Sequence, residues 1–237
     1  SVAEVADKFI DSGVIVSTKS RLDSENSVFT ASRAKTTVPS GTPIVVLINK
    51  GSASASEILA GALKDDHLAY LVGERTYGKG SVQQVIPLYS NDGIKLTMAR
   101  YYTPSDVNID KIGIPPDLEI LFPELSDDEE KAYVELLNST AIENYVFEHP
   151  NMSEKQIADY AKLLQQTYKL TETLLRRLVR VEVQRTKGSA NYDLDYDIQL
   201  NGAIDILEKG NFTQLIKNTK TLKELQDEVI TSGADAE

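Results

Sequence analysis

Two different spacings of apolar positions occur along this chain, and one gives way to the other near residue 121. Before that point, short apolar runs rich in β-branched side chains predict strands at residues 14–19, 28–33, 43–49, 69–73, 81–88 and 94–102. These strands alternate with two helices, one of which is predicted over residues 55–66 by apolar positions at helical spacing. The order is typical of an α/β domain.

A hairpin is predicted between the last two of these strands. The run Asn91-Asp92-Gly93 separates residues 82–88 from residues 94–102. Asn and Gly readily adopt the positive φ angles of tight hairpin turns. We therefore expect the two strands to pair antiparallel.

The second part of the chain is predicted to be helical. Ser126 precedes an acidic first turn, and periodic apolar positions predict helices over residues 132–137, 153–168 and 171–185. The stripe formed by Leu174, Leu175, Leu178 and Val179 is typical of a core-facing helix. The basic residues of the same helix, Arg176, Arg177, Arg180 and Arg185, indicate a solvated or ion-paired face, and a docking surface is the alternative. This part shows no catalytic constellation.

Candidate chemistry is concentrated around Ser54 and Lys79. Ser54 stands among small residues where the strand at 43–49 gives way to the helix at 55–66. The unpaired amides at such a junction favour a developing oxyanion, and the N–H of Ala55 is well placed to bind it. Lys79 is flanked by Gly78 and Gly80, which allow a close approach of the backbone. A hydroxyl and a lysine arranged in this way are what Ser-Lys nucleophilic catalysis requires.

Other interpretations of these residues stay open. Ser54 with Glu57 is also a capping box, in which both side chains only satisfy free amides. An ordinary solvated lysine is the alternative for Lys79. The run Gly73-Glu74-Arg75-Thr76-Tyr77-Gly78-Lys79 matches the start of a phosphate-binding P-loop, but Gly80 replaces the required Ser or Thr and a strand follows in place of a helix.

Several stretches together resemble one known family. They include Gly51-Ser52-Ala53-Ser54-Ala55-Ser56-Glu57 and Gly78-Lys79-Gly80-Ser81-Val82-Gln83. The matching stretches are 1–10, 49–65, 72–83, 96–105, 113–117 and 197–205, so that residues 1 to about 120 match closely and residues 195–209 loosely. Their order and spacing resemble the carboxyl-terminal processing peptidases, also called tail-specific proteases.

The resemblance implies roles for particular residues. Ser54 would be the nucleophile, Lys79 the general base and Gln83 the group that orients the lysine. Ser52 and Ser56 are competing hydroxyls that match the family pattern as small spacers. A lysine acts as a base near neutral pH only if its surroundings lower its affinity for the proton. No cofactor or metal is expected.

The resemblance also implies a fold and a domain plan. It implies an α/β serine protease core of the ClpP/crotonase-like kind, with residues 1–120 as the later part of the core. Residues 121–192 would form a helical insertion, and residues 193–237 would hold helices that return to the core. The family has a PDZ domain and a second oxyanion amide upstream of these residues. We therefore expect this chain, taken alone, to be folded and to have little or no activity.

The amino-acid composition excludes several classes of partner and site. The formal net charge of −11 argues against nucleic acid, and the chain lacks cysteine, so disulfides and thiolate metal sites are excluded. No apolar run approaches the length of a membrane span. His67 follows Ser54 by about three turns at ~1.5 Å per residue, too far for a Ser-His pair within one helix.

The resemblance implies polypeptide substrates cut near their free C-termini through an acyl-enzyme, in the bacterial periplasm or cell envelope. The substrate is expected to lie as an added strand beside the site, because main-chain pairing depends little on sequence. A homo-oligomer formed through the helical region stays open. The alternative from another class is a non-catalytic ligand- or peptide-binding module on the same core, as in the retinoid-binding relatives of this family.

Overall fold

The computed structural model describes residues 1–89, 92–187 and 192–232. Contacts within the chain define two compact units. The first, called the sheet unit, contains Ser1–Leu121 and Asn201–Glu237, and the second, called the helical unit, contains Phe122–Leu200. Each unit has a hydrophobic core of its own.

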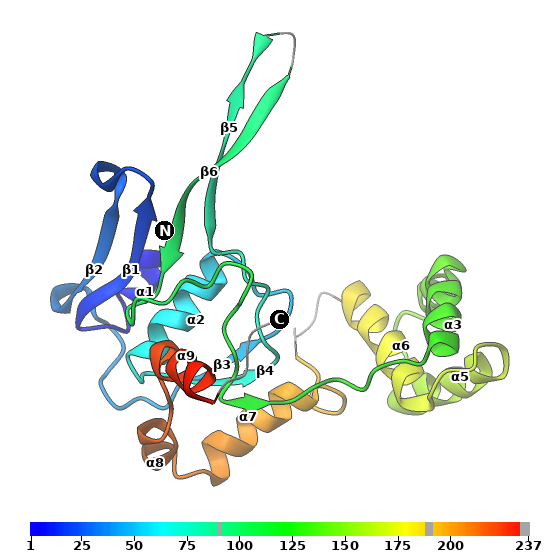
Figure 1. The fold of residues 1–237 in the computed structure, drawn as a ribbon. Helices are drawn as coiled ribbons and strands as arrows, with labels where there is room; N and C mark the ends of the chain where they lie inside the picture. The colour runs from blue at the N-terminus through cyan, green and yellow to red at the C-terminus, as the bar shows by residue number, and fades with distance from the viewer. Residues whose placement is uncertain (90–91, 188–191, 233–237) are drawn as a thin grey trace. The chain divides into compact units, whose positions relative to one another are not determined.

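The sheet unit contains two separate sheets. Four antiparallel strands, in the order β2-β1-β6-β5, form the larger one: β1 (Ser12–Ser20), β2 (Ser27–Ser32), β5 (Ser81–Pro87) and β6 (Gly93–Tyr102). Three parallel strands in the order β3-β4-β7 form the smaller one: β3 (Val45–Ile48), β4 (Tyr70–Gly73) and β7 (Leu118–Glu119). The outer parts of β5 and β6 form a two-stranded ribbon that extends away from the rest of the unit (Figure 1).

The six predicted strands are confirmed, with ends that differ by at most two residues. The antiparallel pairing of β5 with β6 is also confirmed, with Val85 opposite Lys95. Of the predicted turn, Asn91 lies outside the described residues. The continuous apolar run 43–49 also predicts a buried strand, and this expectation is wrong, since Leu47 is 41% exposed. The reason is that β3 is an edge strand of its sheet, so no neighbouring strand covers one of its sides.

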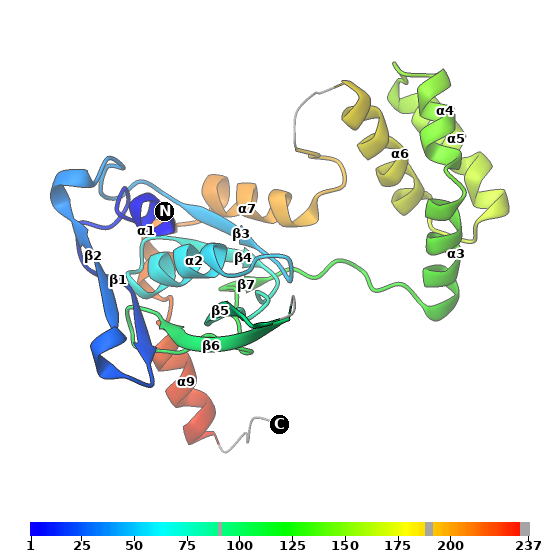
Figure 2. The same cartoon turned by 90° about the horizontal axis from the view of Figure 1, so that it is seen from above.

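Helix α2 (Ala55–Asp65) lies between the two sheets (Figure 2). Its residues Ile58 and Leu63 share one core with Ile15 and Val16 of β1 and with Leu71 of β4. Helix α1 (Val2–Ala6) contributes Ala6 to this core. Two short 3-10 turns, Asp23–Glu25 and Arg33–Lys35, lie on either side of β2. Burial on several sides fixes α2, and therefore the position of its first residue.

The last three described helices are α7 (Ile198–Lys209), α8 (Phe212–Lys217) and α9 (Leu222–Thr231), and the first three residues of α7 still belong to the helical unit. Leu222 is buried in the core of the sheet unit, and its N–H donates to Asp65 Oδ1 at 2.7 Å. A carboxylate at the end of α2 thus anchors the start of α9.

The helical unit contains α3 (Asp127–Asn138), α4 (Ala141–Glu148), α5 (Glu154–Thr167) and α6 (Glu172–Lys187). The three predicted helices are confirmed, but α4 was not predicted. Its only buried residues are Ile142 and Val146, which give too short a periodic pattern. Within the described residues, no helix is both long and apolar enough to cross a bilayer.

The basic cluster on α6 is engaged in ion pairs and ring contacts. Arg180 pairs with Glu154 at 3.3 Å and with Asp193 at 3.4 Å, and Arg185 pairs with Glu182 at 2.6 Å. Arg177 lies over the ring of Phe122. On the opposite stripe, Leu175 and Val179 are fully buried, which confirms the core-facing interpretation.

Candidate active site

Ser54 occupies a tight turn between β3 and α2, where it is the N-cap residue of the helix. Its φ is 55° and its ψ is −110°, a backbone conformation that residues other than glycine rarely adopt. The residue is half-buried. The turn places its hydroxyl at the positive end of α2, where an anion would be stabilised.

The N–H of Ala55, the first residue of α2, has no hydrogen-bond partner among the described residues. Helix geometry explains this, because the first amides of a helix have no carbonyl one turn earlier. A free N–H directly after the candidate nucleophile is what an oxyanion donor requires.

Glu57 connects the two candidate catalytic residues. Its carboxylate is fully buried, and Oε2 accepts the backbone N–H of Ser54 at 2.9 Å and that of Lys79 at 2.8 Å. The other oxygen, Oε1, accepts the Thr76 hydroxyl at 2.6 Å and the Gly78 N–H at 2.6 Å. These four donors satisfy the buried charge. The start of α2 and the turn that carries Lys79 are therefore held against each other.

Sequence reasoning missed this role of Glu57. The Ser-x-x-Glu pattern predicts a capping box, and the bond from the Ser54 N–H to Glu57 agrees with that prediction. The capping boxes of α3 and α9 end in Glu129, which is half-buried, and in Glu224, which is exposed. No local signal distinguishes these from a buried glutamate that also binds a segment 19 to 22 residues later in the chain.

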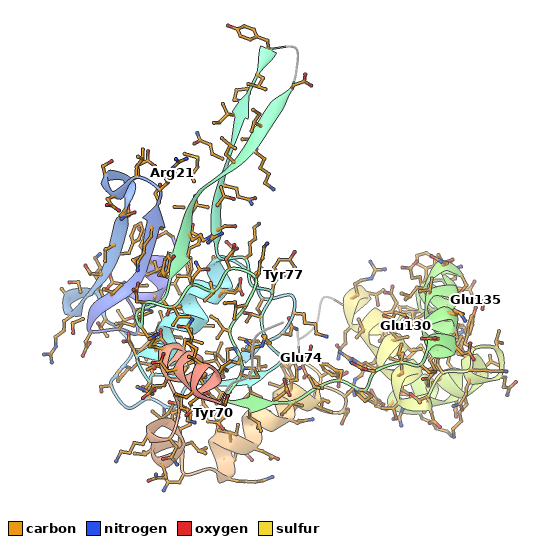
Figure 3. The ribbon with its side chains drawn as sticks, viewed as in Figure 1. Arg21, Tyr70, Glu74, Tyr77, Glu130 and Glu135 are labelled. Atoms are coloured by element: carbon orange, nitrogen blue, oxygen red, sulfur yellow. The ribbon has the colours of Figure 1, made fainter. Side chains whose placement is uncertain are left out.

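Lys79 has a fixed backbone and a free side chain. Gly78 before it has a φ of 86°, and a Cβ there would lie 2.9 Å from the Ile112 nitrogen, so only glycine fits. The Lys79 side chain is exposed, and so is that of Tyr77, which comes from the same segment between β4 and β5 (Figure 3).

The three candidate catalytic side chains are not hydrogen-bonded to one another in this structure. Within the described residues, no hydrogen bond connects the side chains of Ser54, Lys79 and Gln83. Gln83, on β5, donates from Nε2 to Thr97 Oγ1 on β6 at 3.5 Å, which is long for a hydrogen bond. The fold brings the backbones of Ser54 and Lys79 together, and the roles of the side chains stay predictions.

The structure also bears on the other interpretations, namely the neighbouring serines, a P-loop and a metal site. Ser52 Oγ accepts the N–H of Asn49 at 3.2 Å, so this hydroxyl braces the loop before Ser54. Ser56 is exposed on the first turn of α2. After Lys79 and Gly80 the chain continues as strand β5 and not as a helix, which confirms the rejection of a P-loop. Among the described residues, no group of three or more His, Asp or Glu is arranged to hold a metal ion.

Known proteins match the first half of the chain. The profile of peptidase family S41 matches residues 1–120. The carboxy-terminal-processing protease of Bartonella bacilliformis is 49% identical over 119 residues, which are 50% of this chain and 27% of that protein. The chloroplastic C-terminal processing peptidase of Tetradesmus obliquus is 48% identical over 104 residues, 44% of this chain and 22% of that protein.

Among solved structures, the photosystem II D1 C-terminal processing protease shares 40% sequence identity, with a TM-score of 0.44, over 50% of this chain and 30% of its own. The chain thus spans about a quarter of the length of the curated relatives it matches, 27% and 22% in the two cases above. Since the family profile covers half of its residues, the chain belongs to peptidase family S41.

Proposed function

We propose that this chain carries the catalytic serine and lysine of a serine peptidase of the carboxyl-terminal processing type. The observation that carries the proposal is the buried carboxylate of Glu57, which binds the backbones of Ser54 and Lys79 together. A purely capping glutamate would need only the bond to Ser54. The names of the relatives agree with this function.

In the proposed reaction, neutral Lys79 removes the proton from Ser54 Oγ as that oxygen attacks a peptide carbonyl carbon. The Ala55 N–H donates to the resulting oxyanion. When the tetrahedral intermediate collapses, the C–N bond breaks and Lys79 returns the proton to the leaving amine. Water, deprotonated by the same lysine, then attacks the acyl-enzyme ester. The bond between the acyl carbon and Ser54 Oγ breaks, and Lys79 returns the proton to Oγ.

In this mechanism Gln83 orients Lys79. Gln83 lies on β5, which begins two residues after Lys79, and its present bond to Thr97 is weak enough to be exchanged. The conformation described here, with Lys79 exposed, would then be one in which the side chains have not yet closed on one another.

The proposed substrates are polypeptides with free C-termini. Strand β5 is an edge strand of its sheet, so half of its backbone groups face away from β6 and can pair with an extended peptide. We place the sheet unit in the ClpP/crotonase-like class and the helical unit as an insertion in it. The cell envelope is the proposed location for a bacterial protein of this type.

Turnover of an unstructured polypeptide by single variants of the complete natural protein tests the proposal. Ser54→Ala and Lys79→Ala should each abolish hydrolysis, because each removes one half of a proton-transfer pair. The matched controls Ser52→Ala and Ser56→Ala remove neighbouring hydroxyls and should leave most activity. Wild-type turnover by Ser54→Ala would overturn the assignment of the nucleophile. No turnover by the unmodified protein would favour the binding module without catalysis.

A further inference from the structure

A second segment of the sheet unit lies directly behind the Lys79 turn. This backing segment, residues 108–114, touches the turn backbone to backbone. A Cβ on Gly80 would lie 2.4 Å from the Asp110 nitrogen, and a Cβ on Gly113 would lie 2.3 Å from the Thr76 carbonyl oxygen. Contacts this short exclude any side chain at the two glycines. The backing segment therefore defines where the Lys79 turn can be.

Hydrogen bonds fix the peptide groups on both sides of Lys79. Before it, the Lys79 N–H donates to Glu57 at 2.8 Å, and the Gly78 carbonyl accepts the Lys111 N–H at 2.7 Å. After it, the Gly80 N–H donates to Asp110 Oδ1 at 3.2 Å, and the Gly80 carbonyl accepts the Tyr101 N–H at 2.7 Å. The carboxylates of Glu57 and Asp110 thus accept hydrogen bonds from the consecutive N–H groups of Lys79 and Gly80.

The carboxylate of Asp110 is itself held in place. Asp110 is 15% exposed, and its Oδ2 lies 3.8 Å from Nε of Arg100 on β6. Its own N–H donates to Asn108 Oδ1 at 3.0 Å, and Asn108 Nδ2 in turn donates to the Tyr101 carbonyl at 3.0 Å. Asp110 therefore links the Lys79 turn to strand β6 through a defined set of contacts.

We propose that Asp110 is a positioning residue, which acts through Lys79 by fixing the backbone from which the catalytic lysine reaches Ser54. The inference rests on the proposed function. The Lys79 side chain is exposed, so its approach to Ser54 depends on where its Cα is held. A displacement of about 1 Å in such a group can lower the rate about 10²-fold.

Three substitutions separate position from charge in the complete natural protein. Asp110→Asn keeps an oxygen that can accept the Gly80 N–H and removes the charge. Asp110→Glu keeps the charge and moves the carboxylate by one methylene, and Asp110→Ala removes the acceptor. The matched control is Asp106→Asn in a neighbouring loop. It breaks the exposed ion pair between Asp106 and Lys19 of β1. Each variant is assayed for kcat and KM on an unstructured polypeptide, after urea unfolding has shown it to be folded.

If Asp110 positions Lys79, Asp110→Ala and Asp110→Glu lower kcat by about 10²-fold with KM nearly unchanged. Asp110→Asn and Asp106→Asn should retain most of kcat. The inference is overturned if Asp110→Ala or Asp110→Glu keeps the wild-type kcat. It is equally overturned if Asp110→Asn is as impaired as Asp110→Ala, since charge and not position would then matter.

Ser54→Ala and Lys79→Ala are assayed alongside to separate this inference from the proposed function. If either variant turns over substrate at the wild-type rate, the proposed function fails whatever Asp110 does. If both are inactive and the Asp110 variants keep the wild-type kcat, only the positioning inference fails.

Discussion

The backbone N–H of Lys79 donates to Oε2 of Glu57 at 2.8 Å. Glu57 lies three residues after Ser54, the candidate nucleophile. The same oxygen accepts the N–H of Ser54 at 2.9 Å. One buried atom therefore sets the spacing of two residues that are far apart in the chain. Glu57 should therefore be essential to both stability and activity.

Replacing Glu57 should show that it is more than a helix cap. Glu57→Ala leaves buried donors without an acceptor, at about 1–3 kcal/mol of unfolding free energy for each unsatisfied group. Glu57→Gln should also destabilise, because its NH₂ group faces N–H donors. Urea unfolding measures the loss, and turnover should fall in both variants. The control Glu224→Ala removes an exposed capping glutamate, and an equal loss there would contradict the account.

The conformation of Ser54 predicts an unusual response to glycine. With φ at 55° and ψ at −110°, Ser54→Gly relieves strain that Ser54→Ala retains. We expect the glycine variant to be the more stable of the two by about 1 kcal/mol or more. Urea unfolding of both inactive variants checks this. An alanine variant that is equally or more stable would show that the turn is unstrained.

Asp66 should make stability depend on pH. Burial, and then repulsion by Asp65, raise the pKa of Asp66 to about 6, while His67 acts in the opposite direction. In the unfolded chain the pKa is about 3.9, so the folded protein binds the proton more tightly and this contribution to stability is lost as pH rises through about 6. Asp66→Asn should therefore gain unfolding free energy relative to the wild type between pH 4 and pH 7. A difference that stays constant over this range would contradict the shift.

Lys64 should be far more sensitive to substitution than an exposed lysine. Its ammonium pairs with Asp117, and the two side chains are only 1% and 8% exposed. Lys64→Met leaves the carboxylate buried without its counter-ion, which typically costs about 3–5 kcal/mol. The control Lys209→Met breaks an exposed pair with Asp205 and should change the unfolding free energy much less. Similar losses in the two variants would show that burial does not matter here.

Much of the fold could be predicted from the sequence because its signals are local. The strands and α2 follow from apolar periodicity, and the turn at Ser54 follows from small residues between a strand and a helix. Helix α4 was missed because only Ile142 and Val146 carry its pattern. The exposure of Leu47 depends on which strand lies at the sheet edge, and periodicity contains no information on that.

The candidate site was predicted only in part for a similar reason. Ser54, Lys79 and Gln83 were found from motifs, and Ala55 from its place at the helix start. The roles of Glu57 and Asp110 depend on contacts with Lys79 and Gly80, which lie 22 and 30 residues away in the chain. A single sequence contains no local sign of such contacts.

Mapping a fluorophosphonate adduct by mass spectrometry tests the central claim most directly. The reagent is applied to the complete natural protein at neutral pH, and its site and rate of attachment are determined. The account predicts an adduct on Ser54, none on Ser52 or Ser56, and a strongly reduced rate in Lys79→Ala. An adduct on another serine, no adduct at all, or an unchanged rate in Lys79→Ala would contradict the assignment of Ser54 as nucleophile and Lys79 as its base.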